Sequence, residues 1–125
     1  MALIVTNQEE RRILLRTYAS NIDKRSLKMF SKKIGYGNDF IGIYSKEDME
    51  EDPYEFQNEL SEIKSNQILL WAKYPAAPVE ENLYLNFDEF YAYLVEVVNE
   101  RIAETPSDKA EYEHLLSEVK TALGL

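Results

Sequence analysis

The chain has 125 residues and a formal net charge of −9, and 45% of its residues are hydrophobic. This length and composition predict one folded domain over residues 1–125, with enough apolar side chains to build a real core. The absence of cysteine excludes disulfides, thiolate metal ligands and a cysteine nucleophile, and the acidic balance argues against general nucleic-acid binding.

The N-terminus does not have the pattern of a secretion signal. Residues 1–5, MALIV, are too few for the apolar part of a signal peptide, and no basic residue precedes them. No apolar run approaches the roughly 20 residues that span a bilayer. We therefore expect a cytoplasmic protein that does not contact a membrane.

Two helices are expected first. Thr6 has the character of an N-cap, Glu9 stands at the capping-box position, and apolar residues recur at helical spacing over 7–19. A second helix is expected over 22–34, where apolar residues again recur three and four positions apart. The two glycines of the segment 35–38 then predict a turn.

A sheet is expected in the middle of the chain. Residues 40–44 predict a strand in which Gly42 marks the close approach of another backbone. The segment 54–63 fits both a strand and a helix, and we favour the strand because other strands lie on either side of it in the sequence. Residues 67–74 form the most hydrophobic run and predict the central strand. A short connection makes the next strand, 82–87, its antiparallel neighbour.

Two helices close the chain. Asn86 and Glu89 predict a capping box for the first, Thr105 and Pro106 predict the start of the second, and Gly124 ends it. Their apolar stripes are Phe90, Leu94, Val97, Val98 and Ile102, and then Tyr112, Leu115, Leu116, Val119, Ala122 and Leu123. The order of elements predicts an α+β fold, an antiparallel sheet of three to four strands flanked by N-terminal and C-terminal helices.

The most unusual feature is an acidic segment, residues 46–62. It holds eight carboxylates against one lysine, a net charge of −7. Such a run is costly to bury, so it faces water or a basic partner. Charge runs are most often solvated loops, but the aromatic residues within this one favour a partner. The residues expected to bind that partner are Glu47, Asp48, Glu50, Glu51, Asp52, Tyr54, Glu55, Phe56 and Glu59.

Charge is distributed unevenly over the rest of the chain. Residues 1–34 carry eight basic and three acidic side chains, a net charge of +5, and residues 80–125 carry three and eleven, a net charge of −8. A docking face on the last two helices would therefore be as acidic as the acidic segment. The acidic segment ranks first because Tyr54 and Phe56 can anchor a partner.

Few residues support catalysis or cofactor binding. The single histidine, His114, lies within the last predicted helix and is expected at the surface, without the partners of a catalytic set. The chain has no glycine-rich phosphate loop and no His/Cys cluster, and the acidic segment lacks the glycine of an EF-hand loop. Trp71 is expected in the core. We therefore expect a protein that is not an enzyme and that needs no cofactor or metal.

Several stretches of the sequence are similar to a known family. They are YGNDF at 36–40, the acidic segment with its two aromatics, the YP that follows the central strand at 74–75, LYLNFDEFYAYL at 83–94, and the C-terminal part from SDKAE at 107–111 to KTALGL at 120–125. Over residues 35–125 the chain resembles the CdiI immunity proteins, which protect bacteria against the ribonuclease toxins of contact-dependent growth inhibition.

The resemblance implies an inhibitor that binds the C-terminal nuclease domain of a cognate toxin and blocks its RNA site or its catalytic residues. It implies no catalytic residues in this chain, and the partner-binding residues above rest on charge and on the two aromatic residues, not on the family. An acidic adaptor domain unrelated to toxins is the alternative. Two further classes are a hydrolase that uses paired carboxylates and an RNA-binding protein that uses the basic helix at 22–34.

Overall fold

The computed structural model describes residues 2–125 and has six α-helices and five strands in that range. The helices are α1 (Gln8–Tyr18), α2 (Lys24–Phe30), α3 (Lys46–Glu50), α4 (Gln57–Glu62), α5 (Phe87–Glu104) and α6 (Lys109–Ala122). The strands are β1 (Leu3–Ile4), β2 (Tyr36–Gly37), β3 (Ile41–Tyr44), β4 (Gln67–Ala72) and β5 (Glu81–Asn86). Short 3₁₀ turns follow α1 at Ala19–Asn21 and precede α6 at Pro106–Asp108.

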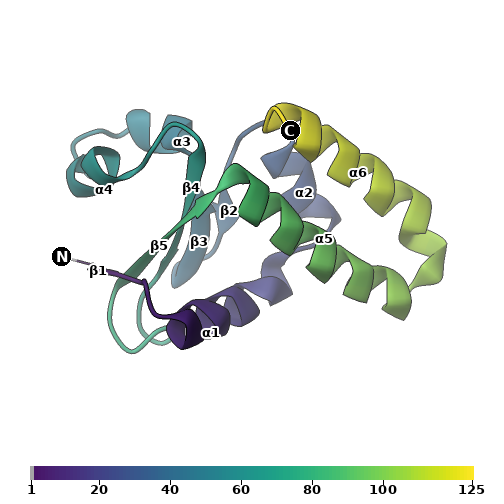
Figure 1. The fold of residues 1–125 in the computed structure, drawn as a ribbon, viewed down its shortest axis with the longest axis horizontal. Coiled ribbons are helices and arrows are strands. Elements are labelled where there is room, and N and C mark those ends of the chain that lie inside the picture. The colour runs from purple at the N-terminus through teal and green to yellow at the C-terminus, as the bar shows by residue number, and fades with distance from the viewer. Residues whose placement is uncertain (1) are drawn as a thin grey trace.

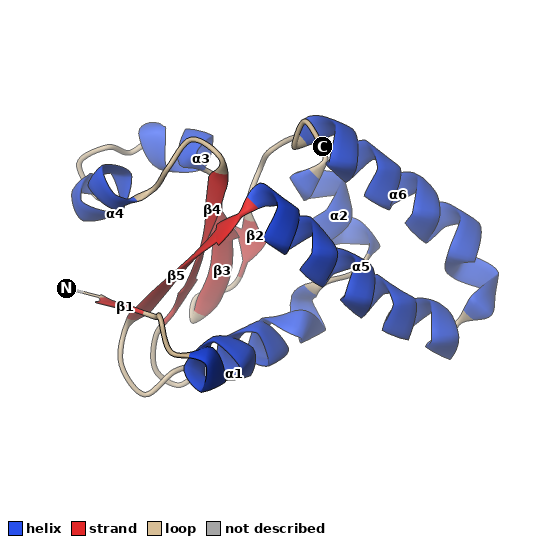
Figure 2. Cartoon of the chain, viewed as in Figure 1, coloured by secondary structure: helices blue, strands red, loops and turns tan. Residues whose placement is uncertain are grey.

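The strands form one sheet in the order β1-β5-β4-β3-β2 (Figure 2). β4 is the central strand, and β5 is its antiparallel neighbour, so both of these predictions are confirmed. The fold is α+β as expected, but the sheet is mixed and has five strands, because β1 adds to β5 in parallel. The two extra strands, β1 and β2, are two residues long, which is too short for the alternation of apolar and polar residues that reveals a strand.

The two faces of the sheet are covered unequally. Alternate residues of β4 point to opposite faces, so Ile68 and Leu70 lie on one face and Leu69 and Trp71 lie on the other. Residues of this first face, of α1, α2 and α5, and of α6, which packs on α2 and α5, form one buried cluster that we call the main core. Within the described residues, the helices on the second face are α3 and α4, which lie over a smaller cluster that we call the second core (Figure 1).

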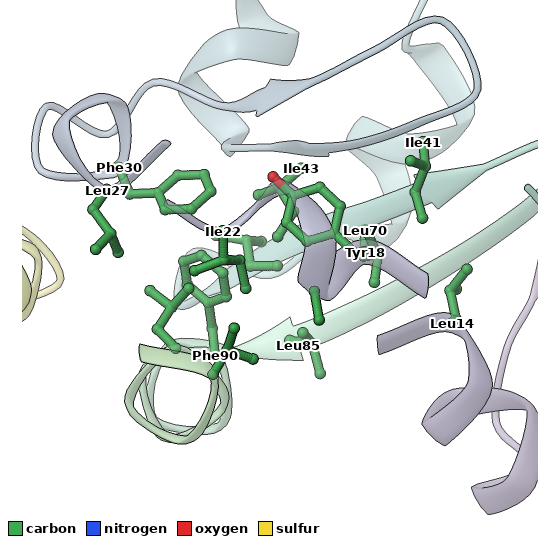
Figure 3. Packing of buried hydrophobic residues seen from close by; sticks show 14 of the residues in the cluster. Leu14, Tyr18, Ile22, Leu27, Phe30, Ile41, Ile43, Leu70, Leu85 and Phe90 are labelled. Atoms are coloured by element: carbon green, nitrogen blue, oxygen red, sulfur yellow. The ribbon is translucent and has the colours of Figure 1, made fainter. Parts of the chain in front are cut away.

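The main core joins the helices to the sheet through large buried side chains (Figure 3). The rings of Phe30 in α2 and Phe90 in α5 meet edge to face with centroids 5.3 Å apart. Tyr18 is fully buried, and its hydroxyl donates a hydrogen bond of 2.6 Å to the carbonyl oxygen of Tyr36. This bond satisfies the one polar atom of the ring and connects the end of α1 to β2.

The helices expected at the two ends of the chain are confirmed. The Asn86 amide donates to Glu89 Oε1 at 3.0 Å, as the capping box requires, and Pro106 begins the 3₁₀ turn that leads into α6. Gly124 ends α6 with a φ of 74°. At the other end, Asn7 is the N-cap of α1 and not Thr6, because the Asn7 side chain reaches the amides of Glu9 and Glu10.

The strand favoured over 54–63 is wrong, because residues 57–62 form helix α4. Tyr54, Phe56 and Leu60 fit the alternation of a strand, but Phe56 and Leu60 also lie one helical turn apart. The amide of Leu60 donates to the carbonyl oxygen of Phe56 at 2.8 Å. Both side chains then turn toward the sheet from one side of the helix, and Pro53 lies in the turn that precedes it.

Two glycines allow the hairpin of β2 and β3 to form beside α3. A Cβ on Gly35 would lie 1.9 Å from the carbonyl oxygen of Ile43, and a Cβ on Gly37 would lie 2.3 Å from Gly42 Cα. A Cβ on Gly42 would meet no atom nearer than 3.5 Å. The close approach of another backbone expected at Gly42 is confirmed, because Gly37 is its cross-strand partner, but the positions that exclude a side chain are Gly35 and Gly37.

Gly35→Ala is expected to lower the free energy of unfolding by about 1–3 kcal/mol, because backbone atoms of β3 block the added methyl group. Gly42→Ala is the matched control and should lower it by less than about 1 kcal/mol, since its methyl group makes ordinary contacts. Urea unfolding of both variants measures the difference. Equal losses in the two variants would contradict this account of the hairpin.

Candidate functional site

The acidic segment covers the second face of the sheet. It consists of α3, a turn and α4, and together they form a thin layer that Figure 1 places on the side of the sheet away from α5 and α6. The layer is attached through the second core, in which Met49, Ile63 and Leu69 are buried. Half-buried side chains surround these three, namely Tyr44, Phe56, Leu60, Trp71 and Tyr84.

Two of the predicted partner-binding carboxylates form hydrogen bonds that connect the acidic segment to the rest of the fold. Asp48 Oδ2 accepts hydrogen bonds from the Gly35 amide at 2.7 Å and from the Ser45 amide at 2.9 Å. Glu59 Oε2 accepts a bond of 3.2 Å from Asn82 Nδ2 in β5. Asp48 therefore holds the start of α3 against the hairpin, and Glu59 connects α4 to the sheet.

The other five predicted carboxylates lie on the outside of the layer. Glu47, Glu50, Glu51, Asp52 and Glu55 are all exposed. Within residues 2–125, no salt bridge involves any of the eight acidic side chains of the acidic segment. A hydrogen bond to the Asp52 side chain, together with the charge of that residue, raises the pKa of Glu55. The outer surface thus carries negative charge that the protein itself does not offset.

The two aromatic residues of the acidic segment have different surroundings. Tyr54 has 85% of its surface exposed, the most of any large hydrophobic residue described. Phe56 is half-buried and packs on Tyr44, with ring centroids 5.4 Å apart. Tyr54 therefore lies where a partner could contact it directly, whereas most of the Phe56 ring contributes to the second core.

The rival acidic surface on the last two helices is partly neutralised by basic residues of α1 and α2. Arg11 and Arg16 of α1 bind Glu89 at 2.7 Å and Glu100 at 3.1 Å in α5. Lys24 of α2 contacts two more carboxylates, Asp108 at 2.9 Å and Glu111 at 3.2 Å. The basic N-terminal helices thus offset part of the charge of the C-terminal helices, whereas no carboxylate of the acidic segment has such a partner within residues 2–125.

A hollow of about 300 Å³ opens between α4 and the second face of the sheet. Aromatic side chains of Tyr44, Phe56 and Trp71 form part of its lining. Carboxylates from three places in the chain, Glu55, Glu59 and Glu80, also line it. Trp71 was expected in the core, but it is half-buried here because it points to the thinly covered face of β4.

The hollow contains residues that the sequence did not single out as site residues. Trp71 and Glu80 come from β4 and the end of the loop before β5, and only the pairing of these strands brings them next to α4. The alternation along β4 places Trp71 opposite to Leu70 and is the one local signal of its position. The sequence alone did not indicate which layer would cover that face.

The remaining features concern catalysis, metal binding and membrane insertion. His114 is exposed and lies beside Glu118, one turn further along α6. Residues 2–125 contain no grouping of three or more histidine and carboxylate side chains suited to a metal ion, and in that range none of the helices has the length and apolar character needed to cross a bilayer. The most developed site in the described chain is an acidic, partly aromatic surface, which is typical of a protein that binds a basic partner.

Comparison with known proteins identifies the family. The profile described as CDI immunity protein matches residues 10–116. The chain therefore belongs to the CDI immunity proteins, the proteins that protect against toxins of contact-dependent growth inhibition. No curated protein and no solved structure matches the chain significantly.

Proposed function

We propose that the protein binds the C-terminal nuclease domain of a cognate toxin, a ribonuclease, and neutralises it with the outer surface of α3 and α4. A ribonuclease holds its substrate in a basic groove, since phosphate neutralisation requires lysine and arginine. A surface dense in carboxylates is complementary to that groove. The protein acts in this proposal by occupying the toxin, without chemistry of its own.

One observation carries the proposal. The acidic segment has eight carboxylates that form no salt bridge within residues 2–125, whereas four of the C-terminal carboxylates, Glu89, Glu100, Asp108 and Glu111, have partners in α1 and α2. Unpaired surface charge of one sign attracts an oppositely charged protein over long range and raises association rates by about 10- to 1,000-fold. Tyr54 supplies an exposed ring in the middle of this charge, and tyrosine is enriched among residues that dominate binding energy.

The test is co-purification with the toxin C-terminal domain encoded beside this gene, followed by an RNA cleavage assay. We expect a stable complex and loss of RNA cleavage once the inhibitor equals the toxin in amount. A toxin that is bound and neutralised but cuts DNA, or acts on another target, would contradict the ribonuclease assignment. Failure to bind the toxin at all would contradict the proposal and would favour the acidic adaptor.

A further inference from the structure

We infer that the hollow beneath α4 binds one arginine side chain of the basic partner. The inference rests on the proposed function, because it names the group of the toxin that anchors the complex. Its evidence comes from the lining of the hollow, from a lysine that lies over the ring of Trp71, and from the buried amide that holds one of the lining carboxylates.

The lining combines the two features that bind a guanidinium group. The rings of Phe56, Tyr44 and Trp71 follow one another across the second face, with centroids 5.4 Å apart for the first pair and 6.4 Å for the second. Aromatic faces attract cations within about 6 Å, arginine more often than lysine. Glu55, Glu59 and Glu80 supply three carboxylates around the same space, and a guanidinium can bind a carboxylate with two parallel hydrogen bonds.

The chain's own Lys73 shows that a cation fits over the tryptophan. Its Nζ lies 5.7 Å from the centroid of the Trp71 ring. Lys73 follows Trp71 by two residues, so both side chains point to the second face. Lys73 is exposed, which leaves it free to move aside when a partner's cation enters.

An unpaired acceptor lies close to the same carboxylates. Asn82, which donates to Glu59, has only 1% of its surface exposed, and its Oδ1 has no hydrogen-bond partner in the described chain. Asn82 is the cross-strand neighbour of Trp71. Asn82 does not itself line the hollow, and its enclosed Oδ1 acts only indirectly: the amide holds the carboxylate of Glu59, which does line the hollow. The groups that an occupant meets directly are therefore the carboxylates of Glu55, Glu59 and Glu80. Arginine has five N–H donors and no acceptor.

The size of the hollow fits a single side chain. Its volume of about 300 Å³ is at the lower end of the range of small-ligand sites, about 300–1,000 Å³. It is therefore too small for a folded element of the partner but suits one long side chain. Carboxylates on several sides select for positive charge in that side chain.

Trp71 is the only tryptophan of the chain and therefore reports on the hollow directly. The first experiment titrates the protein with N-acetylarginine amide and, as a neutral isostere, N-acetylcitrulline amide. We expect the arginine compound to shift the indole N–H resonance of Trp71 in a saturable way and the citrulline compound to leave it in place. No shift with either compound, or equal shifts with both, would overturn the inference.

The second experiment measures toxin binding by calorimetry with paired variants. Glu55→Gln with Glu59→Gln should weaken binding at least about tenfold, since truncating one side of a partly buried charge pair is costly. Gln at 59 keeps an oxygen for Asn82, so the fold should hold. The control, Glu47→Gln with Glu51→Gln, removes the same charge outside the hollow and should weaken binding by no more than about threefold.

Lys73→Ala adds a test in which toxin binding is expected to become tighter, not weaker. Because it vacates the face of Trp71, it should tighten toxin binding by about two- to fivefold, whereas Lys120→Ala on α6, which makes the same change in charge, should not.

If the toxin binds and is inhibited but the Glu55/Glu59 pair behaves like its control, the inference fails and the proposed function stands. If the toxin does not bind at all, the proposed function fails, and the arginine titration still decides what the hollow accepts.

Discussion

Replacing Glu50, Glu51 and Asp52 with lysine is expected to slow association with the toxin by at least about tenfold at low salt, because steering by a charged surface accounts for factors of about 10–1,000. The triple change turns three exposed carboxylates into three ammonium groups and alters the net charge by six units. The rate constant of association, measured by stopped flow at several salt concentrations, gives the result. The difference from the wild type should shrink as salt rises, since screening weakens long-range attraction.

The control for this variant makes the same charge change on the other layer. Glu96, Glu104 and Glu113 are exposed residues of α5 and α6, and their replacement by lysine also alters the net charge by six units. We expect the association rate of this control to fall several-fold less than that of the first variant. Equal rates for the two variants would mean that net charge alone matters, and a slower control would move the interface to the C-terminal helices.

Met49→Ala is expected to destabilise the acidic layer by about 2–5 kcal/mol, the usual cost of truncating a large buried side chain. Met49 is fully buried and is one of three buried residues in the second core. Because the cluster is so small, few other side chains can replace the lost contacts. The layer should open locally, and toxin binding should weaken in proportion to the fraction of molecules that are open.

Hydrogen exchange separates this outcome from general unfolding. In Met49→Ala, amides of residues 46–62 should exchange faster, while those of β4, α5 and α6 keep their protection. Leu94→Ala is the control, because Leu94 is equally buried but belongs to the main core. That variant should lose protection throughout. Uniform loss of protection in Met49→Ala would show that the two cores unfold as one.

The elements with long and regular apolar patterns could be predicted from the sequence. The stripes of α5 and α6 repeat over several turns, and the residues expected in them, such as Leu94 and Val119, are buried. The segment 54–63 was predicted wrongly because Phe56 and Leu60 fit both periods, together with Tyr54 in a strand and with Ile63 in a helix. The choice between them depends on the turn at Pro53 and on the sheet face that Phe56 and Leu60 cover.

The candidate site could be predicted only where it is continuous in sequence. The acidic segment is visible as a run of carboxylates, and its exposed members, from Glu47 to Glu55, lie on the surface as expected. Two features of the site could not be predicted from the sequence. The pairing of Arg16 with Glu100 joins residues 84 positions apart, and the hollow joins Trp71 to α4 through strand pairing. Both depend on tertiary structure, which no local pattern encodes.

The existence of two separate cores bears on how partner preference can change in such a protein. Side chains on the outer surface of α3 and α4 do not contribute to the main core. Substitutions at distant sites without shared contacts have additive effects on stability. If the outer surface of α3 and α4 binds the toxin as proposed, its exposed side chains, such as Glu47, Glu50 and Glu51, can be exchanged to suit a different toxin without a matching change among the helices on the other face. Recognition could then change while the main core stays the same.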